Sequence, residues 1–196
     1  MYEYISGKVA ELTPTYAVID CSGVGYFLNI SLQTYSEIGS LSEFKLYVHY
    51  IVREDVQVFY GFSSKQEREL FRSLISVSGV GGGTARMILS TYQTAELENI
   101  IVQGNSSLLS KVKGLGVKTS QKIIVELRDK IQKGSTPVSL SSVTAAASSA
   151  SFDEAVAALL MLGFTKQASE KAILSVIKEN PAAAVEQVVR LSLKKM

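Results

Sequence analysis

Residues 76–89 read SVSGVGGGTARMIL, with glycines at 79, 81, 82 and 83 and an apolar, helix-like pattern directly after them. Glycine at this density weakens regular secondary structure, because glycine loses more conformational freedom on folding than any other residue. The pattern recurs 35 positions later, where residues 111–124 read KVKGLGVKTSQKII. The middle of the chain is therefore predicted to contain, twice, a helix, a sharp Gly-apolar-Gly turn and a second helix.

Matching residues on both sides of the turn fix the register between the two copies. The matched pairs are Leu74 and Leu109, Val77 and Val112, Gly79 and Gly114, Val80 and Leu115, Gly81 and Gly116, and Thr84 and Thr119. Two copies in one register are far more specific than either copy alone. We therefore expect both turns to serve the same purpose.

Such a turn is suited to binding phosphate. The glycines let the chain reverse with its N–H groups facing outward, and the apolar residue between them anchors the turn in a core. The next helix presents unpaired N–H groups and the positive end of its dipole to an anion. The predicted phosphate-binding residues are Gly79, Val80, Gly81, Gly82, Gly83, Thr84 and Arg86 in the first copy, and Gly114, Leu115, Gly116, Val117, Lys118, Thr119 and Lys122 in the second. Contacts to the DNA backbone carry little sequence information. The alternative is a pair of glycine turns between packed helices, with no ligand.

Two nucleotide-binding motifs do not fit these turns. A Rossmann fingerprint follows a strand and has a third glycine where Thr84 and Thr119 stand, whereas helices are predicted before both turns. A P-loop has a glycine directly before its Lys-Ser/Thr pair, but Val117 precedes Lys118-Thr119.

The first 62 residues are typical of β-strands. The runs YISGKVAEL, YAVIDC, GYFLNI, KLYVHYIV and VQVFYGF are rich in Val, Ile, Tyr and Phe, and polar or glycine residues separate them. Short strands in this number predict a small closed or nearly closed barrel, with one short helix near residues 32–39. From Ser64, which has capping-box spacing to Glu67, the apolar period becomes helical. Further helices are expected near residues 84–91, 94–103, 106–112 and 119–132.

The last part of the chain begins with a change of composition. Residues 134–150, GSTPVSLSSVTAAASSA, carry no charge and no apolar period, which is typical of a flexible linker. Residues 151–196 predict three short helices, in which Ser151 and Glu154 have capping-box spacing, Gly163 ends the first helix and Asn180-Pro181 begins the third. The sequence thus predicts an α+β, multi-domain chain. Its parts are a barrel domain at 1–63, a helical middle domain at 64–133, a linker at 134–150 and a three-helix domain at 151–196.

The charge is distributed unevenly along the chain. Residues 1–63 carry 3 basic and 7 acidic side chains, residues 64–133 carry 11 and 6, and residues 134–196 carry 6 and 5. The net charges are therefore −4, +5 and +1, although the whole chain has only +2. A basic middle domain indicates an anionic partner for that domain.

Composition excludes several other classes. Cys21 is the only cysteine, so an internal disulfide and a cysteine metal cluster are impossible, and we expect a structural role for His49, the only histidine. No apolar run approaches the roughly 20 residues of a membrane span. The start, MYEYISGKVAEL, lacks the basic and apolar regions of a secretory signal. A cytoplasmic protein is expected.

With these features the chain resembles the RuvA family of Holliday-junction-binding subunits. The resemblance covers the full length and includes VGY at 24–26, VREDVQVFYGF at 52–62 and KQERELF at 65–71. It implies an N-terminal OB-fold barrel, a middle domain with tandem helix-hairpin-helix motifs, and a mobile third domain, similar to ubiquitin-associated bundles, that docks on the hexameric ATPase RuvB. It also implies a homotetramer, alone or paired to an octamer, that holds a four-way junction open and square. A functional link to the resolvase RuvC is expected, and no catalytic residue, metal or cofactor is expected in this chain.

The first hairpin departs from the family's pattern. The resemblance implies that a Pro-Lys pair often follows Gly-Val-Gly, but Gly82 and Gly83 stand there in this chain. This removes a cation near a phosphate and loosens the turn. We therefore expect the second hairpin, with Lys118, to contribute more of the affinity.

Arg53-Glu54-Asp55 lies between two strand-like runs and forms an acidic turn. From the sequence alone, a polar hairpin tip is the simplest interpretation. The resemblance implies an acidic pin near the centre of the tetramer, where DNA strands separate. In that role Glu54 and Asp55 repel phosphates and guide the strands without cleaving them.

Two other functions are compatible with hairpins of this kind. A helix-hairpin-helix glycosylase or nuclease needs a catalytic Asp or Lys, or a metal cluster, near the hairpin. The acids nearest in sequence, Glu96, Glu98, Glu126 and Asp129, show no recognisable arrangement. A general duplex-binding adaptor is the third possibility.

Overall fold

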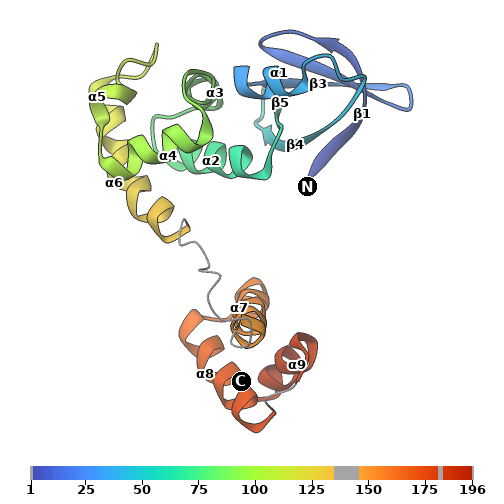
Figure 1. Ribbon diagram of the computed structural model, residues 1–196, viewed down its shortest axis with the longest axis vertical. Coiled ribbons are helices and arrows are strands. Elements are labelled where there is room, and N and C mark those ends of the chain that lie inside the picture. The colour runs from blue at the N-terminus through green and yellow to red at the C-terminus, as the bar shows by residue number, and fades with distance from the viewer. Residues whose placement is uncertain (1, 135–145, 181–182, 196) are drawn as a thin grey trace. The chain divides into compact units, whose positions relative to one another are not determined.

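The structure, a computed structural model, describes residues 2–134, 146–180 and 183–195. The chain forms two compact units, Met1–Thr136 and Pro137–Met196. Strands occupy the start of the first unit and helices follow in both, as Figure 1 shows. The predicted fold class is therefore confirmed.

The first 62 residues form the predicted closed barrel. Its strands are β1 (Tyr4–Leu12), β2 (Tyr16–Cys21), β3 (Val24–Ile30), β4 (Glu43–Val52) and β5 (Gln57–Phe62), and α1 (Leu32–Ile38) connects β3 to β4. The strands pair in the order β1-β2-β3-β5-β4, and the ring closes between β4 and β1. Its core consists of buried side chains from alternate strand positions and from α1: Ile5, Ala17, Ile19, Leu28, Ile30, Ile38, Leu46 and Val48.

One seam of the barrel differs from the others. β3 and β5 run parallel, whereas the other neighbours are antiparallel, and they pair at Leu28, Asn29 and Ile30. The earlier residues of the two strands do not continue this ladder. The barrel surface therefore has a groove beside the seam.

Helices fill the rest of the first unit. They are α2 (Lys65–Ser76), α3 (Gly82–Thr91), α4 (Thr94–Gln103), α5 (Ser106–Leu109) and α6 (Val117–Gly134). The Ser64 side chain accepts a hydrogen bond from the Glu67 N–H at 3.1 Å, so the predicted cap of α2 is confirmed. Phe62, the last residue of β5, is buried in the helical core with Phe71 and Leu74, which joins the barrel to the helices by apolar packing.

A buried carboxylate also joins the barrel to the helices. Glu67 of α2 is fully buried and accepts hydrogen bonds from Thr34 Oγ1 at 2.7 Å, from Ser63 Oγ at 3.3 Å and from the Ser31 hydroxyl. Ser31 and Thr34 belong to the N-terminus of α1. Burial raises the pKa of Glu67, and these hydrogen bonds partly oppose the rise because they favour the charged form.

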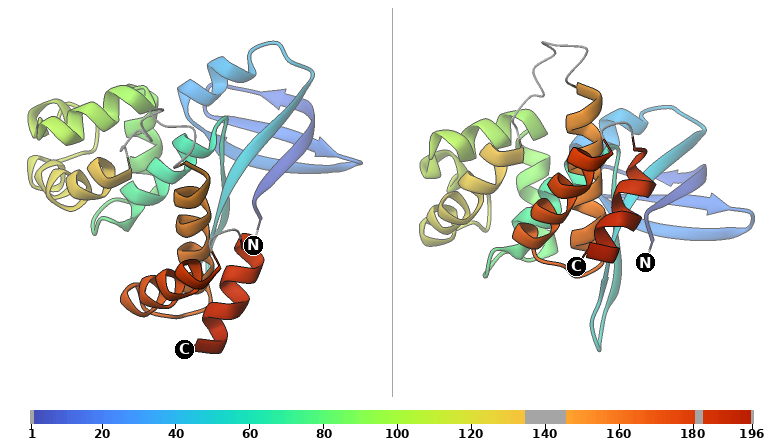
Figure 2. Two further views of the ribbon diagram at one scale, coloured as in Figure 1. Left: turned by 60° about the horizontal axis from the view of Figure 1, so that its bottom comes forward. Right: turned by 90° about the horizontal axis from the view of Figure 1, so that it is seen from below.

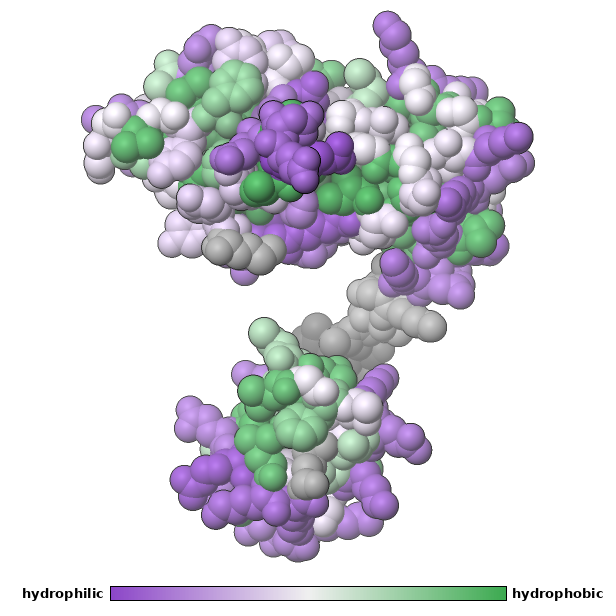
Figure 3. Space-filling view, turned by 180° about the vertical axis from the view of Figure 1, so that it is seen from behind, coloured by the Kyte–Doolittle hydropathy of each residue, from purple (hydrophilic) through white to green (hydrophobic). Residues whose placement is uncertain are grey.

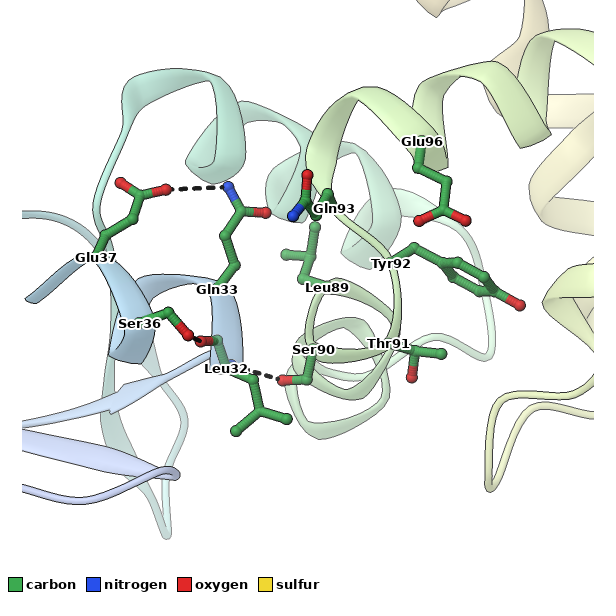
Figure 4. A pocket seen from close by; sticks show the side chains of 10 residues that line it. All are labelled: Leu32, Gln33, Ser36, Glu37, Leu89, Ser90, Thr91, Tyr92, Gln93 and Glu96. Carbon is green, nitrogen blue, oxygen red and sulfur yellow. Dashed lines mark hydrogen bonds between the residues drawn. The ribbon is translucent and has the colours of Figure 1, made fainter. Parts of the chain in front are cut away.

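Further polar contacts continue along the same joint. Arg68, almost fully buried, donates to the Glu3 carbonyl oxygen and to Glu3 Oε1, both at 2.9 Å. Figure 4 shows the other side, where the Leu32 N–H donates to Ser90 Oγ at 3.1 Å across a pocket of about 430 Å³. Beside it, the Thr94 N–H donates to the Gln33 side-chain oxygen at 3.2 Å. The helical domain is thus fixed to the barrel at several points.

Gly82, in the first turn of α3, lets the helix approach the barrel closely. A Cβ atom on Gly82 would lie 2.6 Å from Cζ and the hydroxyl oxygen of Tyr60 in β5, whereas a Cβ on Gly83 would meet no atom within 4 Å. The two adjacent glycines therefore have different surroundings. Gly82 is buried against the barrel and Gly83 is exposed.

The second unit consists, in its described residues, of α7 (Ala146–Met161), α8 (Lys166–Glu179) and α9 (Val185–Lys195). Its core is formed by Ala155, Val156, Leu159, Ile173, Val176 and Val188. Gly163, with φ of +96°, ends α7 as predicted, and the Phe164 N–H donates back to the Leu159 carbonyl at 3.1 Å.

Two predicted helix starts in this unit are wrong. α7 begins at Ala146 and not at Ser151, because the alanines before Ser151 are strong helix formers and extend the helix into the predicted linker. Asn180 ends α8 by donating its N–H to the Val176 carbonyl, and α9 begins only at Val185. Pro181 and most of the predicted linker, residues 135–145, lie outside the described residues.

Replacing Gly82 with alanine should destabilise the first unit. The new methyl group would force apart α3 and the Tyr60 ring, which we expect to lower the free energy of unfolding by about 1–3 kcal/mol. Gly83→Ala is the matched control. It has open space around it and improves helix propensity, so it should raise the free energy of unfolding by up to about 1 kcal/mol. Urea denaturation followed by circular dichroism measures both, and equal effects would contradict the proposed close contact.

The stability of the joint should depend on pH through Glu67. Because its pKa is raised above the ordinary value of 4.5, the folded protein holds this proton to higher pH than the unfolded chain does. The stabilisation of the folded state by protonated Glu67 is complete at low pH, and it is lost as the pH rises through the raised pKa. The free energy of unfolding of the wild type, minus that of Glu67→Gln, should therefore fall as the pH rises above the ordinary value of 4.5. A constant difference would show that Glu67 titrates normally.

Candidate nucleic-acid interface

The two glycine turns have the same backbone structure. Gly79 and Gly114 both adopt positive φ, at +93° and +84°, which side-chain-bearing residues rarely do. The hydrogen bonds also match: the Val80 N–H donates to the Val77 carbonyl and the Leu115 N–H to the Val112 carbonyl, both at 3.0 Å. The predicted repeat is therefore present at the level of individual bonds.

Apolar residues hold both turns in one core. Val80 and Leu115, the residues between the glycines, are each 5% exposed and belong to the core of the helical domain. Val77 and Val112, three residues before them, are also buried there. Because their apolar residues are buried in the core, the turns hold their glycines at the surface in fixed positions.

Each turn leads directly into a helix start that no Cβ obstructs. Gly81 is the N-cap of α3 and has no side-chain cap, and its counterpart Gly116 precedes α6. Both are exposed, and a Cβ on either would meet no atom within 4 Å. The first N–H groups of a helix have no partner within the helix. An anion can therefore reach the first N–H groups of both α3 and α6.

The two hairpins differ strongly in charge. Exposed lysines surround the second hairpin, and the positions 35 residues earlier around the first hairpin are neutral. The pairs are Lys111 and Ser76, Lys113 and Ser78, Lys118 and Gly83, and Lys122 and Met87. Lys111 and Lys113 are not among the predicted phosphate-binding residues, although the 35-residue repeat aligns them in the same way as Lys118.

Arg86, the predicted cation of the first hairpin, contacts the barrel. Its Nη1 donates to the Thr15 carbonyl at 2.9 Å and to Asn29 Oδ1 at 2.8 Å. Lys122 lies 3.8 Å from Glu126 on the exposed face of α6. The first hairpin is thus mainly a backbone surface, and formal positive charge gathers at the second.

The remaining predicted residues fall into three environments. Thr84 and Thr119 are half-buried at equivalent positions, Val117 and Lys118 are exposed, and Gly82 is buried against Tyr60. The turns, the helix starts and the lysines therefore make up the accessible part of the candidate interface.

The acidic turn connects β4 to β5. The Arg53 N–H donates to the Val56 carbonyl at 2.8 Å, which closes the turn and leaves Glu54 and Asp55 exposed at its tip. Figure 2, in its right view, shows this β4–β5 hairpin projecting beyond the rest of the barrel. The two carboxylates are therefore held away from the barrel body.

The acids considered for catalysis are dispersed. Glu98 accepts a hydrogen bond from Gln66 at 3.1 Å, and Glu126 lies beside Lys122. Among the described residues, no group of three or more His, Cys, Asp or Glu side chains could hold a metal ion. None of the helices in the described ranges is long and apolar enough to cross a membrane.

The second unit has an apolar surface of its own. Figure 3 shows apolar side chains gathered on one face of this unit. Exposed apolar residues follow the end of α7 through the turn, namely Leu160, Met161, Leu162 and Phe164. Nearby, a groove of about 610 Å³ is lined by Phe164, Ala168, Lys171, Ala172, Ser175 and Lys195. A surface of this kind is typical of a binding site for another protein.

Known proteins match the whole chain. Family models match in order: "RuvA N terminal domain" at residues 1–61, "SAM-like Helix-hairpin-helix tandem" at 71–129 and "RuvA, C-terminal domain" at 150–196. Relatives named "Holliday junction branch migration complex subunit RuvA" include one from Bacteroides fragilis, 52% identical over all of both chains. Others are from Parabacteroides distasonis, 46% identical over 99% of both, and Flavobacterium psychrophilum, 40% identical over all of both.

Proposed function

Because the chain belongs to the RuvA family, we propose that it is the subunit of a branch-migration complex that binds four-way junction DNA. The observation that carries this proposal is the pair of matched hairpins, whose open helix starts can each receive a backbone phosphate. Both hairpins are anchored in one core, so their separation is fixed. A fixed pair of phosphate sites recognises the path of the DNA backbone and not its base sequence.

The two hairpins have different roles in the proposed DNA binding. The first offers N–H groups and little formal charge, so it orients the backbone through geometry. The second adds the charges of Lys111, Lys113, Lys118 and Lys122, so it supplies most of the electrostatic affinity. In this proposal the second hairpin compensates for the absence of a lysine at Gly83.

The competition between a four-way junction and a linear duplex of equal length tests the proposed function. Junction preference is expected for a protein that reads the path of several arms at once. Equal affinity would instead favour a general duplex-binding adaptor. Strand cleavage or base release by the purified protein would favour the enzyme alternative, whereas we propose that this subunit is not catalytic.

Lys118→Ala should weaken junction binding to the same extent for every base sequence. Loss of one phosphate contact should also reduce the slope of log affinity against log salt by about 1. Gly83→Lys is the matched variant, since it places a lysine at the equivalent exposed position of the first hairpin. It should tighten binding and steepen the slope. Fluorescence anisotropy over a salt series measures both variants, and a loss that varies with base sequence would argue against backbone recognition.

The acidic tip acts in the proposed complex as a pin between DNA strands. Its carboxylates lie in water at the end of a projecting hairpin, so they repel any phosphate that approaches and discourage a duplex from lying across the tip. The tip therefore lowers affinity and guides strand separation.

Glu54→Gln combined with Asp55→Asn should tighten junction binding, because it removes two negative charges without shortening the side chains. The effect should be larger at low salt, where the repulsion is less screened. The rate of branch migration, measured with the complete complex, should also change. Unchanged affinity across the salt series would remove the basis for this role.

The second unit serves, in this proposal, as the docking site for the ATPase RuvB, which drives migration. The exposed apolar residues around the turn after α7 support docking of a protein partner. Connection to a DNA-bound unit raises the local concentration of docking sites around the junction. We further propose a homotetramer, alone or as a pair of tetramers, a functional link to the resolvase RuvC, and action on DNA in the cytoplasm.

A further inference from the structure

The barrel has an exposed pair of aromatic rings that its core does not require. Phe27 of β3 is 51% exposed, and its ring stacks on that of Tyr16 in β2 with centroids 4.6 Å apart and planes inclined by 26°. The neighbours of Phe27 along β3 point inward, where Leu28 is fully buried. Phe27 therefore presents a flat apolar surface to solvent on the outer face of β2 and β3.

The groove beside the β3–β5 seam lies next to this pair. It has a volume of about 420 Å³, within the range of small-molecule sites, and is lined by Gly25, Tyr26, Phe27, Asn29, Gln57, Val58 and Phe59. The groove exists because β3 and β5 pair only from Leu28 onward. Aromatic rings provide stacking surfaces there. Asn29 already bonds to Arg86 and to the Phe59 carbonyl, and Gln57 Oε1 accepts from the Tyr50 hydroxyl, so the Gln57 amide nitrogen is the main polar donor that faces a ligand.

Two residues that line the groove connect it to elements of the candidate DNA interface. At one end, Asn29 Oδ1 accepts the hydrogen bond from Arg86, which belongs to the helix that starts at the first hairpin. At the other end, Gln57 begins β5 directly after the turn that carries Glu54 and Asp55. The groove therefore lies on strands that are linked to the first hairpin through Arg86 and to the acidic tip through β5.

These features match an unpaired nucleobase better than a duplex. Stacking on an aromatic side chain requires access to the face of a base, and in a duplex the neighbouring bases cover that face. Proteins that bind single strands combine aromatic platforms with nearby positive charge, and barrels of this type use the face of strands 2 and 3 for it. Here the nearby cation is Arg86, whose Nη1 also donates to Thr15 and Asn29, and the Tyr16 hydroxyl donates to the Glu11 carboxylate at the edge of the platform.

We propose that the Tyr16–Phe27 face and the adjoining groove bind an unpaired DNA base at the point where strands exchange between arms. The inference rests on the proposed function, because a four-way junction that migrates exposes such bases beside the acidic tip. The site would hold a base while its old pair is broken and its new pair is not yet formed.

A tryptophan at position 27 tests the proposal directly. The chain contains no tryptophan, so Phe27→Trp introduces a single fluorophore and keeps an aromatic surface. Its emission should be quenched by an oligodeoxythymidylate of roughly 16 nucleotides and by a junction with unpaired bases at the crossover. A fully paired linear duplex should leave the emission unchanged. Unchanged emission with saturating oligodeoxythymidylate would overturn the proposal.

Phe27→Ala provides a second, independent measurement. It should weaken binding of the oligodeoxythymidylate by roughly 5- to 100-fold, the loss expected for one base–aromatic stack, and leave duplex affinity unchanged. Val24→Ala is the matched control, since Val24 is similarly exposed on the same strand but does not line the groove. Equal affinity of Phe27→Ala and wild type for the single strand would overturn the proposal.

Two further outcomes separate this inference from its alternatives. If Phe27→Ala changes the native mass in sedimentation experiments, the face is a contact between copies of the chain and the base-binding role is overturned. If the wild type shows no junction preference while Phe27→Trp is still quenched by the single strand, the proposed function fails and the groove still binds bases. If junction preference holds without quenching, only the groove proposal fails.

Discussion

The buried carboxyl group of Glu67 is the constraint that holds the helical domain, with its two hairpins, on the barrel of the first unit. A carboxylate without water is costly unless hydrogen bonds satisfy it, and the hydroxyl donors come from Ser31, Thr34 and Ser63 at the end of the barrel. Glu67 itself belongs to α2, whose C-terminus leads into the first hairpin. The hydrogen bonds to the Glu67 side chain thus fix the angle between the barrel and the helical domain. The apolar packing of Phe62 and the contacts of Arg68 maintain the same angle from other sides.

The two hairpins share their backbone geometry but differ in charge. Both hairpins have the same glycine conformation and the same anchoring, so an open helix start is present at both, whatever charged side chains lie near it. Charge is then added at one copy only, through lysines whose counterparts are neutral. The single arginine near the first copy is directed to the barrel, where it links Asn29 and Thr15 to α3. Under the proposed function, this division would let DNA move at the first hairpin while the second retains affinity.

Most of the fold could be predicted from local patterns in the sequence. The alternation of apolar residues predicted the barrel strands, and the glycine register predicted both hairpins down to the buried residue between the glycines. No local sequence pattern predicted the contacts between distant segments. Nothing near Gly82 in the sequence indicates that it packs on Tyr60, and nothing near Arg86 indicates its contact with Thr15. The helix boundaries at Ser151 and Asn180 were wrong because capping motifs competed with alanine propensity and with the end of the preceding helix. The roles of the hairpin residues, the acidic tip and the second unit stay predictions.

The contact of Gly82 with Tyr60 also sets how closely α3 lies against the barrel in this chain. These residues lie in different domains, yet a side chain at position 82 fits only if the ring at position 60 shrinks or moves. A larger residue at 82 in this chain therefore requires the end of the Tyr60 side chain to move aside. A chimaera that joins this barrel to the helices of a relative with proline at that position would show whether the ring can move without loss of stability.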